Sequence, residues 1–270
     1  MRKALRQFAP AVTVAWMNRA ARMTPVGDWV LAGRLGGFYD LSYYRHCDHL
    51  IGNTLGIVQW LEAQGWPAGR AHHLPNFSTD YGTALRTRPD WLPAGAKLVL
   101  AMGRLHRNKA FDVLIRAMTA LPGVFLLIAG EGPERASLED LARREGVAAR
   151  VRMPGWRDDT VALLASADLL VCPSRHEPLG NVIIEAYSAR LPVVAAASQG
   201  PVELINSGTD GILVPVEDAP ALAAAIGAVL GDPAAAARLG HAGRARYEAE
   251  FAEAPVLERW RAFLSVVEKA

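Results

Sequence analysis

The chain has 270 residues, 51% of them hydrophobic, which is enough for one large or two medium domains with a sizeable core. A net charge of only +2 favours no class of charged partner, and the seven tryptophans lack the interleaved basic residues of a nucleic-acid-binding surface. The sequence shows no secretory signal, no run of ~20 apolar residues and no metal-ligand spacing of its two cysteines, so we expect a cytoplasmic protein that needs no metal.

The N-terminal third is less regular than the rest. Its strand-like segments are Ala9–Trp16, His49–Gly52 and His72–Asn76, and Asn53–Gln64 has the pattern of a helix. Residues 1–90 hold ten basic against six acidic residues, whereas the remainder holds 19 against 21. The excess would suit peripheral association with an anionic inner membrane, although an ordinary solvated face is the simpler interpretation.

From Lys97 onward, strand-like and helix-like segments alternate. The strand-like runs are residues 97–105, 124–133, 150–153, 169–172, 192–197 and 211–216. The helical segments are residues 111–118, 134–145, 159–166, 181–189, 201–206, 219–230 and 233–248. This order predicts an α/β fold with a doubly wound, Rossmann-like parallel sheet, whose ligands lie at the carboxyl ends of its strands.

These patterns divide the chain into three parts. Residues 1–90 predict a partial N-terminal domain that ends in a linker, and residues 91–250 predict the doubly wound domain. Residues 251–270 contain a final helix with an apolar stripe that includes Trp260 and Phe263. Such a stripe must dock on another element, and we expect it to pack back toward the N-terminal domain.

Two cations follow the first strand of the doubly wound domain. Arg104 and Lys109 lie in GRLHRNKAFDVLIRA (Gly103–Ala117), between the end of that strand and the next helix. Cations at a strand end can neutralise a diphosphate, whereas a solvated basic loop is the alternative interpretation. We favour the diphosphate because two glutamates lie downstream on the same predicted sheet edge.

The next strand ends in the turn GEGP, which contains Gly130 and Glu131. The turn could begin a dinucleotide-binding fingerprint, but the third glycine would fall at Arg135, and no clear ribose-binding acid follows about 20 residues later. A dehydrogenase is therefore a weak alternative. We interpret the turn as a tight strand-to-helix connection that lines the ligand pocket.

The segment HEPLGNVIIEAYSARLPVVAAASQGPVELI (His176–Ile205) carries most of the functional information. It places Glu177 in a loop and Glu185 in the first turns of a helix, among apolar neighbours. A carboxylate in such surroundings needs a partner. For Glu185 a ribose diol would serve, and so would a structural salt bridge. Glu177 in the loop could instead pair with Arg175.

The start of that helix suits an anion. Leu179, Gly180 and Asn181 open it and can offer backbone N–H groups to a phosphate. A diphosphate flanked by two sugars, as in a nucleotide-sugar, would use both these N–H groups and the carboxylates.

The order of these motifs resembles the donor domain of retaining GT-B glycosyltransferases, and most closely glycosyltransferase family 4 (group 1). The resemblance rests on Arg104 and Lys109, GEGP, E-P-L-G-x₄-E and the later GPVELI. It covers roughly residues 97–230. It implies two Rossmann-like domains, a nucleotide-sugar donor bound by the C-terminal one, and no required metal or other cofactor.

The resemblance also implies a role for each residue. Arg104 and Lys109 would bind the donor diphosphate and stabilise the charge of the leaving group. Glu177 would face the donor sugar, Glu185 would hold the ribose, and the backbone of residues 179–181 would meet the sugar and phosphates. In such enzymes the leaving diphosphate is expected to accept the proton of the incoming hydroxyl on the same face.

The sequence departs from the family pattern in a few places. Lys109 is followed by Ala110 where the family often has glycine, and Arg190 stands where glycine often precedes Leu-Pro. We expect both to be tolerated. The N-terminal part resembles only the later part of the family's first domain, through WMNRAARMTP, DHLIGNT and HLPNFS, so we expect a chain shortened at its start.

The function implied is transfer of a sugar from a UDP- or GDP-sugar to a glycan or lipid-linked acceptor, as in the biosynthesis of lipopolysaccharide or another surface polysaccharide. The alternative is a nucleotide-sugar-binding fragment with weak transfer, because the acceptor-side domain is incomplete by comparison with the family. An epimerase or phosphorylase on the same fold would need acid–base residues or a pyridoxal phosphate lysine that the sequence does not place.

Overall fold

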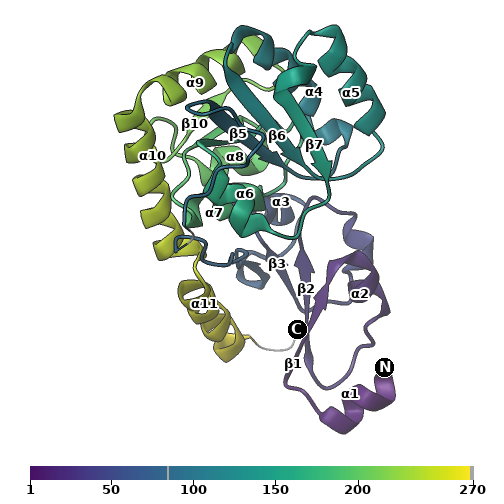
Figure 1. Ribbon diagram of the computed structural model, residues 1–270. Coiled ribbons are helices and arrows are strands. Elements are labelled where there is room, and N and C mark those ends of the chain that lie inside the picture. The colour runs from purple at the N-terminus through teal and green to yellow at the C-terminus, as the bar shows by residue number, and fades with distance from the viewer. Residues whose placement is uncertain (84, 268–270) are drawn as a thin grey trace. The chain divides into compact units, whose positions relative to one another are not determined.

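The computed structural model describes residues 1–83 and 85–267, which form two compact units (Figure 1). Unit 1 comprises Met1–Phe77 together with the described residues from Glu253 onward, and unit 2 comprises Ser78–Ala252. Each unit contains one parallel sheet with helices. The predicted α/β fold class is therefore confirmed.

Unit 1 is built on a four-stranded sheet in the order β1-β2-β3-β4, in which every neighbouring pair is parallel. Its strands are β1 (Val12–Trp16), β2 (Val30–Leu35), β3 (His49–Gly52) and β4 (Ala71–His73). Its helices are α1 (Arg2–Phe8), α2 (Met17–Met23), α3 (Leu55–Ala63) and α11 (Glu253–Val266). The elements that the sequence indicates for this part are all present; β3 has the predicted bounds, and the others have shifted ends.

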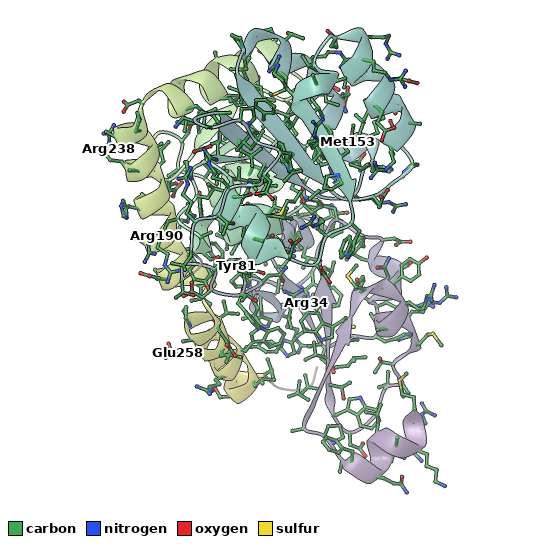
Figure 2. The ribbon with its side chains drawn as sticks, viewed as in Figure 1. Arg34, Tyr81, Met153, Arg190, Arg238 and Glu258 are labelled. Atoms are coloured by element: carbon green, nitrogen blue, oxygen red, sulfur yellow. The ribbon has the colours of Figure 1, made fainter. Side chains whose placement is uncertain are left out.

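The sequence did not indicate β2, nor helices α1 and α2. All six residues of β2 are buried, because the strand lies between β1 and β3, but Gly33 and Arg34 interrupt its apolar run. Arg34 is labelled in Figure 2. A Cβ on Gly33 would lie 2.6 Å from Cδ1 of Tyr44 and 2.9 Å from Sγ of Cys47. The glycine is thus required by close packing of distant residues, which hydropathy does not reveal.

The apolar stripe of α11 packs within unit 1. Trp260 stacks on Trp16 with the ring centroids 6.1 Å apart, and Phe263 lies edge-on to His72 at 4.9 Å. Phe263 is buried in this contact. Aromatic burial of this kind accounts for the docking that the stripe requires.

Unit 2 is built on a six-stranded parallel sheet in the order β10-β9-β8-β5-β6-β7. Its strands are β5 (Lys97–Met102), β6 (Val124–Ala129), β7 (Val151–Gly155), β8 (Leu169–Cys172), β9 (Val193–Ala196) and β10 (Ile212–Val214). Its α-helices are α4 (Phe111–Ala117), α5 (Arg135–Arg144), α6 (Thr160–Ser166), α7 (Asn181–Ser188), α8 (Gln199–Leu204), α9 (Ala219–Gly231) and α10 (Pro233–Arg246). One core lies under α4, α5 and α9, and a second under α6 and α7, as a doubly wound sheet requires.

The boundary between the units lies at Ser78, whereas the sequence pattern predicts it at residue 91. The segment after Ser78 belongs to unit 2, because its arginines bond to residues farther along that unit. Arg88 donates to the carbonyl of Ser166 over 3.0 Å and pairs with Asp168 at 2.9 Å, and Arg86 pairs with the same carboxylate at 2.5 Å. Because these bonds join residues far apart in sequence, no local pattern predicts them.

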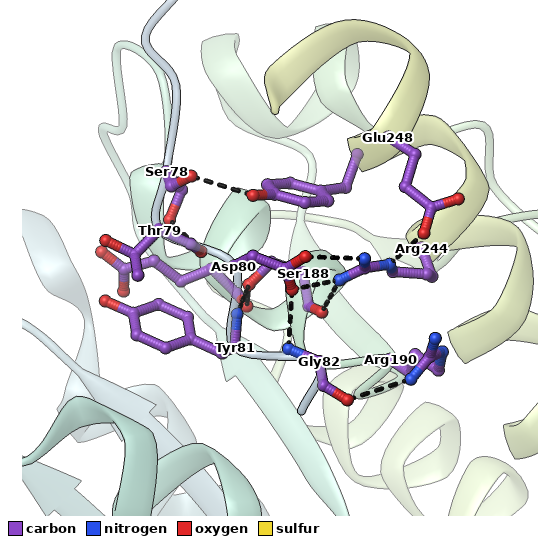
Figure 3. A network of polar contacts seen from close by, with 11 residues as sticks. Ser78, Thr79, Asp80, Tyr81, Gly82, Ser188, Arg190, Arg244 and Glu248 are labelled. Atoms are coloured by element: carbon purple, nitrogen blue, oxygen red, sulfur yellow. Dashed lines mark hydrogen bonds and ion pairs between the residues drawn. The ribbon is translucent and has the colours of Figure 1, made fainter. Parts of the chain in front are cut away.

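Arg244 ties the beginning of unit 2 to helix α7 (Figure 3). Its Nη1 and Nη2 donate to the two carboxylate oxygens of Asp80 over 2.5 and 2.8 Å, and Nη1 also donates to the carbonyl of Ser188 over 2.6 Å. The hydroxyl of Tyr247 donates to the carbonyl of Ser78 over 2.9 Å. The network therefore fixes the first residues of unit 2 against its helices.

Removal of the Asp80 carboxylate should lower stability at neutral pH but not in acid. The hydrogen bond from Arg244 lowers the pKa of Asp80 from 3.8 to about 2. A carboxyl whose pKa is lower in the folded state stabilises the fold above its unfolded pKa, and that stability is lost as the pH falls through the folded pKa. We expect Asp80→Asn to lower Tm by roughly 1–4 °C at neutral pH. The difference from wild type should shrink between about pH 4 and pH 2, and a constant difference would contradict this role of the pair.

No single helix among the described residues is long and apolar enough to cross a bilayer, and the one pair of helical stretches that meets the requirement together, Ala219–Gly231 with Pro233–Val266, is bent by 100°. Within the same residues, no group of three or more His, Cys, Asp or Glu side chains could hold a metal ion.

Candidate active site

The carboxyl edge of the unit 2 sheet brings two of the nominated residues into contact. Strand β5 leads toward Lys109, and its neighbour β8 leads toward Glu177. Nζ of Lys109 forms an ion pair with Oε2 of Glu177. Residues that lie 68 positions apart in the sequence thus meet, because the carboxyl ends of adjacent parallel strands share one edge.

Glu177 is held in place by a hydroxyl as well as by the lysine. The residue is only 7% exposed, and Oγ of Ser174 donates to Oε2 over 3.1 Å. The other oxygen, Oε1, accepts no hydrogen bond from a described residue. Sequence reasoning missed Ser174, although its place three residues before the glutamate could have drawn attention to it. The arrangement leaves Oε1 free to accept a hydrogen bond from a ligand hydroxyl.

Arg104 supplies uncompensated positive charge at this edge. Its side chain is exposed and forms no ion pair with a described residue. Lys109 and Glu177 cancel each other formally, so these two residues together with Arg104 carry one net positive charge. A cationic cluster at a strand end favours a ligand with phosphate groups.

Glu185 is a half-buried carboxylate in α7 that bonds to no described side chain. Burial raises its pKa, and no opposing charge offsets the effect. Leaving such a group without hydrogen-bond donors is unfavourable. A ligand with a pair of hydroxyls would supply them.

The start of α7 has no side-chain cap that would compete with an anion. Gly180 precedes the helix with φ +95°, and the N–H of Ile183 donates to the carbonyl of Gly180 over 2.9 Å. A Cβ on Gly200 would lie 2.2 Å from the carbonyl oxygen of Leu179, and the N–H of Gly200 donates to the carbonyl of Glu177 over 2.7 Å. This close backbone packing fixes the loop that carries Leu179 and Gly180, while Asn181 lies exposed at the first position of the helix.

The GEGP turn lies at the carboxyl end of β6, next to β5. A Cβ on Gly130 would lie 1.9 Å from the carbonyl oxygen of Gly103, so the backbones of the two loops touch. The carboxylate of Glu131 is bound by Arg135, with Oε1 to Nη2 at 2.7 Å and Oε2 to Nε at 3.0 Å. Gly130 therefore shapes the site through its backbone, and the side chain of Glu131 is paired outside the Lys109–Glu177 contact.

Arg175 does not pair with Glu177, which corrects the salt bridge considered from the sequence. Its guanidinium donates to both carboxylate oxygens of Asp112 at 2.8 Å and pairs with Glu217. The pKa of Arg175 is raised chiefly by the hydrogen bond to Asp112. The neighbouring His176 is exposed, and its N–H donates to a backbone carbonyl over 3.3 Å. Arg175 thus fixes the loop before Glu177, and the ion-pair partner of Glu177 is Lys109.

The two positions where glycine was expected from the family pattern have the same backbone conformation. Ala110, which follows Lys109, has φ +53°, and Arg190, which follows α7, has φ +57°. Both angles lie in the left-handed region, where a side chain carries a steric cost and glycine does not. The departures are tolerated, but they store strain: Ala110 directly after Lys109, and Arg190 beyond the C-terminal end of α7, away from the site.

A glycine at position 110 should therefore stabilise the protein. We expect Ala110→Gly to gain about 1 kcal/mol, which would raise Tm by roughly 2–4 °C. Arg190→Gly is the matched comparison, and its gain should be smaller because Nη1 of Arg190 donates to the carbonyl of Gly82 over 3.1 Å. A lower Tm for Ala110→Gly would show that left-handed strain is absent there.

Comparison with known proteins shows the family to which the chain belongs. The sequence pattern of the family described as "Glycosyl transferases group 1" matches residues 87–246. The chain belongs to the group 1 glycosyltransferases. As a group 1 glycosyltransferase it is a transferase, and the matched segment contains all nine of the residues nominated for the site.

Relatives of this glycosyltransferase extend the match beyond unit 2. It is 36% identical over 266 residues to the lipopolysaccharide core biosynthesis glycosyltransferase LpsE of Rhizobium meliloti, an alignment that covers 96% of this chain and 77% of the relative. It is 33% identical over 263 residues to LpsD of the same organism, again covering 96% of this chain and 76% of the relative. The similarity therefore spans both units.

A solved structure shows the same fold. Anabaena HepE, crystallised with UDP and glucose, matches with a TM-score of 0.85 at 22% identity, over 98% of this chain and 81% of HepE. The α/β architecture with parallel sheets is the GT-B type of such glycosyltransferases.

Proposed function

We propose that this glycosyltransferase moves a sugar from a nucleotide-diphospho-sugar to a glycan or lipid-linked acceptor with retention of the anomeric configuration, as expected of family 4. The observation that carries the proposal is the cluster at one sheet edge. There the Lys109–Glu177 pair, the unpaired Arg104 and the partnerless Glu185 offer cations for a diphosphate and carboxylates for hydroxyls.

Each group would act through charge or orientation. Lys109 and Arg104 would bind the two phosphates and stabilise the negative charge that grows on the diphosphate as the glycosidic bond breaks. Oε1 of Glu177 would accept a hydrogen bond from the donor sugar and set its orientation. A phosphate oxygen of the leaving diphosphate would take the proton of the incoming hydroxyl, on the face from which it departs.

The substrates are proposed from the relatives. HepE was solved with UDP and glucose, and LpsE carries the name of a lipopolysaccharide core enzyme. We propose a UDP- or GDP-sugar as donor and a lipopolysaccharide core intermediate as acceptor, handled on the cytoplasmic side, with peripheral contact to the inner membrane. We further propose that transfer needs no metal or other cofactor, because the cations of the protein would serve the diphosphate.

A thermal-shift panel of UDP-, GDP- and ADP-sugars tests donor binding. A donor at ~100 times its Kd should stabilise the native state by ~2.7 kcal/mol. Lys109→Ala and Glu185→Ala should each reduce that shift. An unchanged shift in both variants would exclude this edge as the donor site.

Glu185→Gln separates binding from stability. The pKa of Glu185 is raised in the folded state, so ionisation of this group destabilises the fold above its unfolded pKa and does nothing below it. The amide removes that penalty, so Tm at pH 7.5 should not fall. Its advantage over wild type should grow as the pH rises from the unfolded pKa to the folded pKa of Glu185 and stay constant above it. Loss of a hydrogen bond to a charged group should weaken donor binding about 10- to 100-fold, measured by titration calorimetry. A lower Tm with unchanged donor affinity would mean that Glu185 is a structural residue.

Turnover distinguishes the transferase from a nucleotide-sugar-binding fragment. Transfer to a solubilised lipopolysaccharide core acceptor, followed by NMR assignment of the new anomeric centre, should give a product with the configuration of the donor. An inverted product would contradict the retaining mechanism. Donor binding without any transfer would favour the fragment.

A further inference from the structure

Arg34 in unit 1 is a buried cation that no carboxylate balances. It is the fifth residue of β2, labelled in Figure 2, and its relative exposure is only 6%. None of the ion pairs among the described residues includes it. A charge taken out of water is costly unless it is paired and fully hydrogen-bonded, so this arginine requires an explanation.

The contacts of Arg34 are all with neutral groups. Nη2 donates to Oδ1 of Asn76 over 2.5 Å and to the carbonyl of Leu74 over 3.4 Å, and the guanidinium carbon lies 4.4 Å from the ring centroid of Trp16. Nε is buried and has no hydrogen-bond partner. Burial lowers the pKa of Arg34 to about 10, so the group stays charged at neutral pH. The charge thus lacks an anionic partner, and the N–H of Nε remains unsatisfied.

A second unsatisfied polar group and a strained residue lie near the same end of the sheet. Trp16, which ends β1, is in register with Arg34, and β3 continues into Asn53, a buried residue whose Oδ1 has no partner. Met17, directly after β1, has the strained φ of +70°, and the Gly36–Gly37 loop follows β2. Ligands of parallel α/β sheets bind outside the carboxyl ends of the strands, and strain of this kind clusters at functional sites.

We propose that Arg34 binds an oxyanion, a phosphate or a carboxylate, on the acceptor, at the carboxyl end of the unit 1 sheet. The proposal rests on the proposed function for the identity of the acceptor. An oxyanion would balance the charge and accept the N–H of Nε, and the planar guanidinium matches its geometry. The donor is assigned to the edge of the unit 2 sheet, where Lys109 and Arg104 already supply cations. The anion at Arg34 therefore belongs to the other substrate.

The experiment compares three forms of a solubilised lipopolysaccharide core acceptor: untreated, phosphatase-treated and carboxyl-reduced. Acceptor affinity is measured by titration calorimetry without donor, and KM for each substrate is measured where transfer occurs. Arg34→Gln should weaken binding of the untreated acceptor about 10- to 100-fold, because it removes a charged hydrogen bond. KM for the donor should stay within roughly twofold of wild type, since the donor contacts are elsewhere.

The treated acceptors identify the anion. On the form that lacks the bound group, wild type and Arg34→Gln should bind equally, so phosphatase sensitivity assigns a phosphate and sensitivity to reduction assigns a carboxylate. Arg34→Lys keeps the charge and should retain part of the affinity. Arg22→Gln is the matched control, because Arg22 is exposed and likewise lies over an aromatic ring, 5.8 Å from that of Tyr43. Its acceptor affinity should equal that of wild type.

Three outcomes would overturn the proposal: equal loss on all acceptor forms, a rise in the donor KM alone, or wild-type affinity that neither treatment changes. The last needs no variant, so it decides the matter even if Arg34→Gln fails to fold. Absence of transfer by wild type would count against the proposed function but not against the anion site, because acceptor binding is measured independently.

Discussion

A Lys109→Met variant should lose about 10²- to 10³-fold in kcat/KM, the effect of removing one group that stabilises transition-state charge. The variant should also be less stable by about 3 kcal/mol, because Glu177 would remain as a buried carboxylate without its cation. Lys109 is 26% exposed and Glu177 is 10% exposed at the side chain, so solvent screens the pair only in part. Steady-state kinetics and urea denaturation measure the two effects separately.

Variants of Glu177 show whether the losses of stability and of activity come from Lys109 or from Glu177. Glu177→Gln keeps Lys109, which can reach water, so it should cost less stability than Lys109→Met. In the double variant Lys109→Met with Glu177→Gln no buried charge is left, and stability should return to within about 1 kcal/mol of wild type. Activity should not return, because the cation is still missing. Recovery of activity in the double variant would mean that Lys109 serves only to neutralise Glu177.

Gly130→Ala should be among the most damaging single-methyl substitutions in unit 2. The new Cβ would lie 1.9 Å from the carbonyl oxygen of Gly103, and the φ of +154° is one that side chains rarely allow. The N–H of Gly103 donates to Ala129 and that of Leu105 to Glu131, so neither loop can move without breaking bonds between β5 and β6. We expect a loss of about 3 kcal/mol or more, which corresponds to a fall in Tm of roughly 6–12 °C.

Gly123→Ala is the control for that substitution. Gly123 also has positive φ, +75°, but a Cβ there would meet nothing within 4 Å. It should therefore lose only the cost of the left-handed conformation, about 1 kcal/mol. The difference between the two variants measures the contact between the loops. Donor affinity should fall for Gly130→Ala and stay unchanged for Gly123→Ala, and equal effects would show that the contact is unimportant.

Unit 1 shows why part of the fold could not be predicted from the sequence. A strand is recognised by its apolar run, and β2 contains Gly33, required by the ring of Tyr44, and Arg34. Both residues are explained by contacts with side chains outside the strand, so a local sequence pattern cannot account for them. The unit boundary could not be predicted from the sequence for the same reason, since Arg88 is held in unit 2 by hydrogen bonds to residues about 80 positions away.

The sequence by itself determined the alternation of strands and helices after Lys97 and the residue types of the site, because hydrophobic periodicity and glycine turns are local properties. Only the tertiary structure decided the partners. In it Lys109 pairs with Glu177, Arg175 pairs with Asp112, and Arg34 has no carboxylate partner among the described residues. Such pairings depend on which strand ends are neighbours in the sheet and on how each side chain is buried, and these are properties of the whole fold.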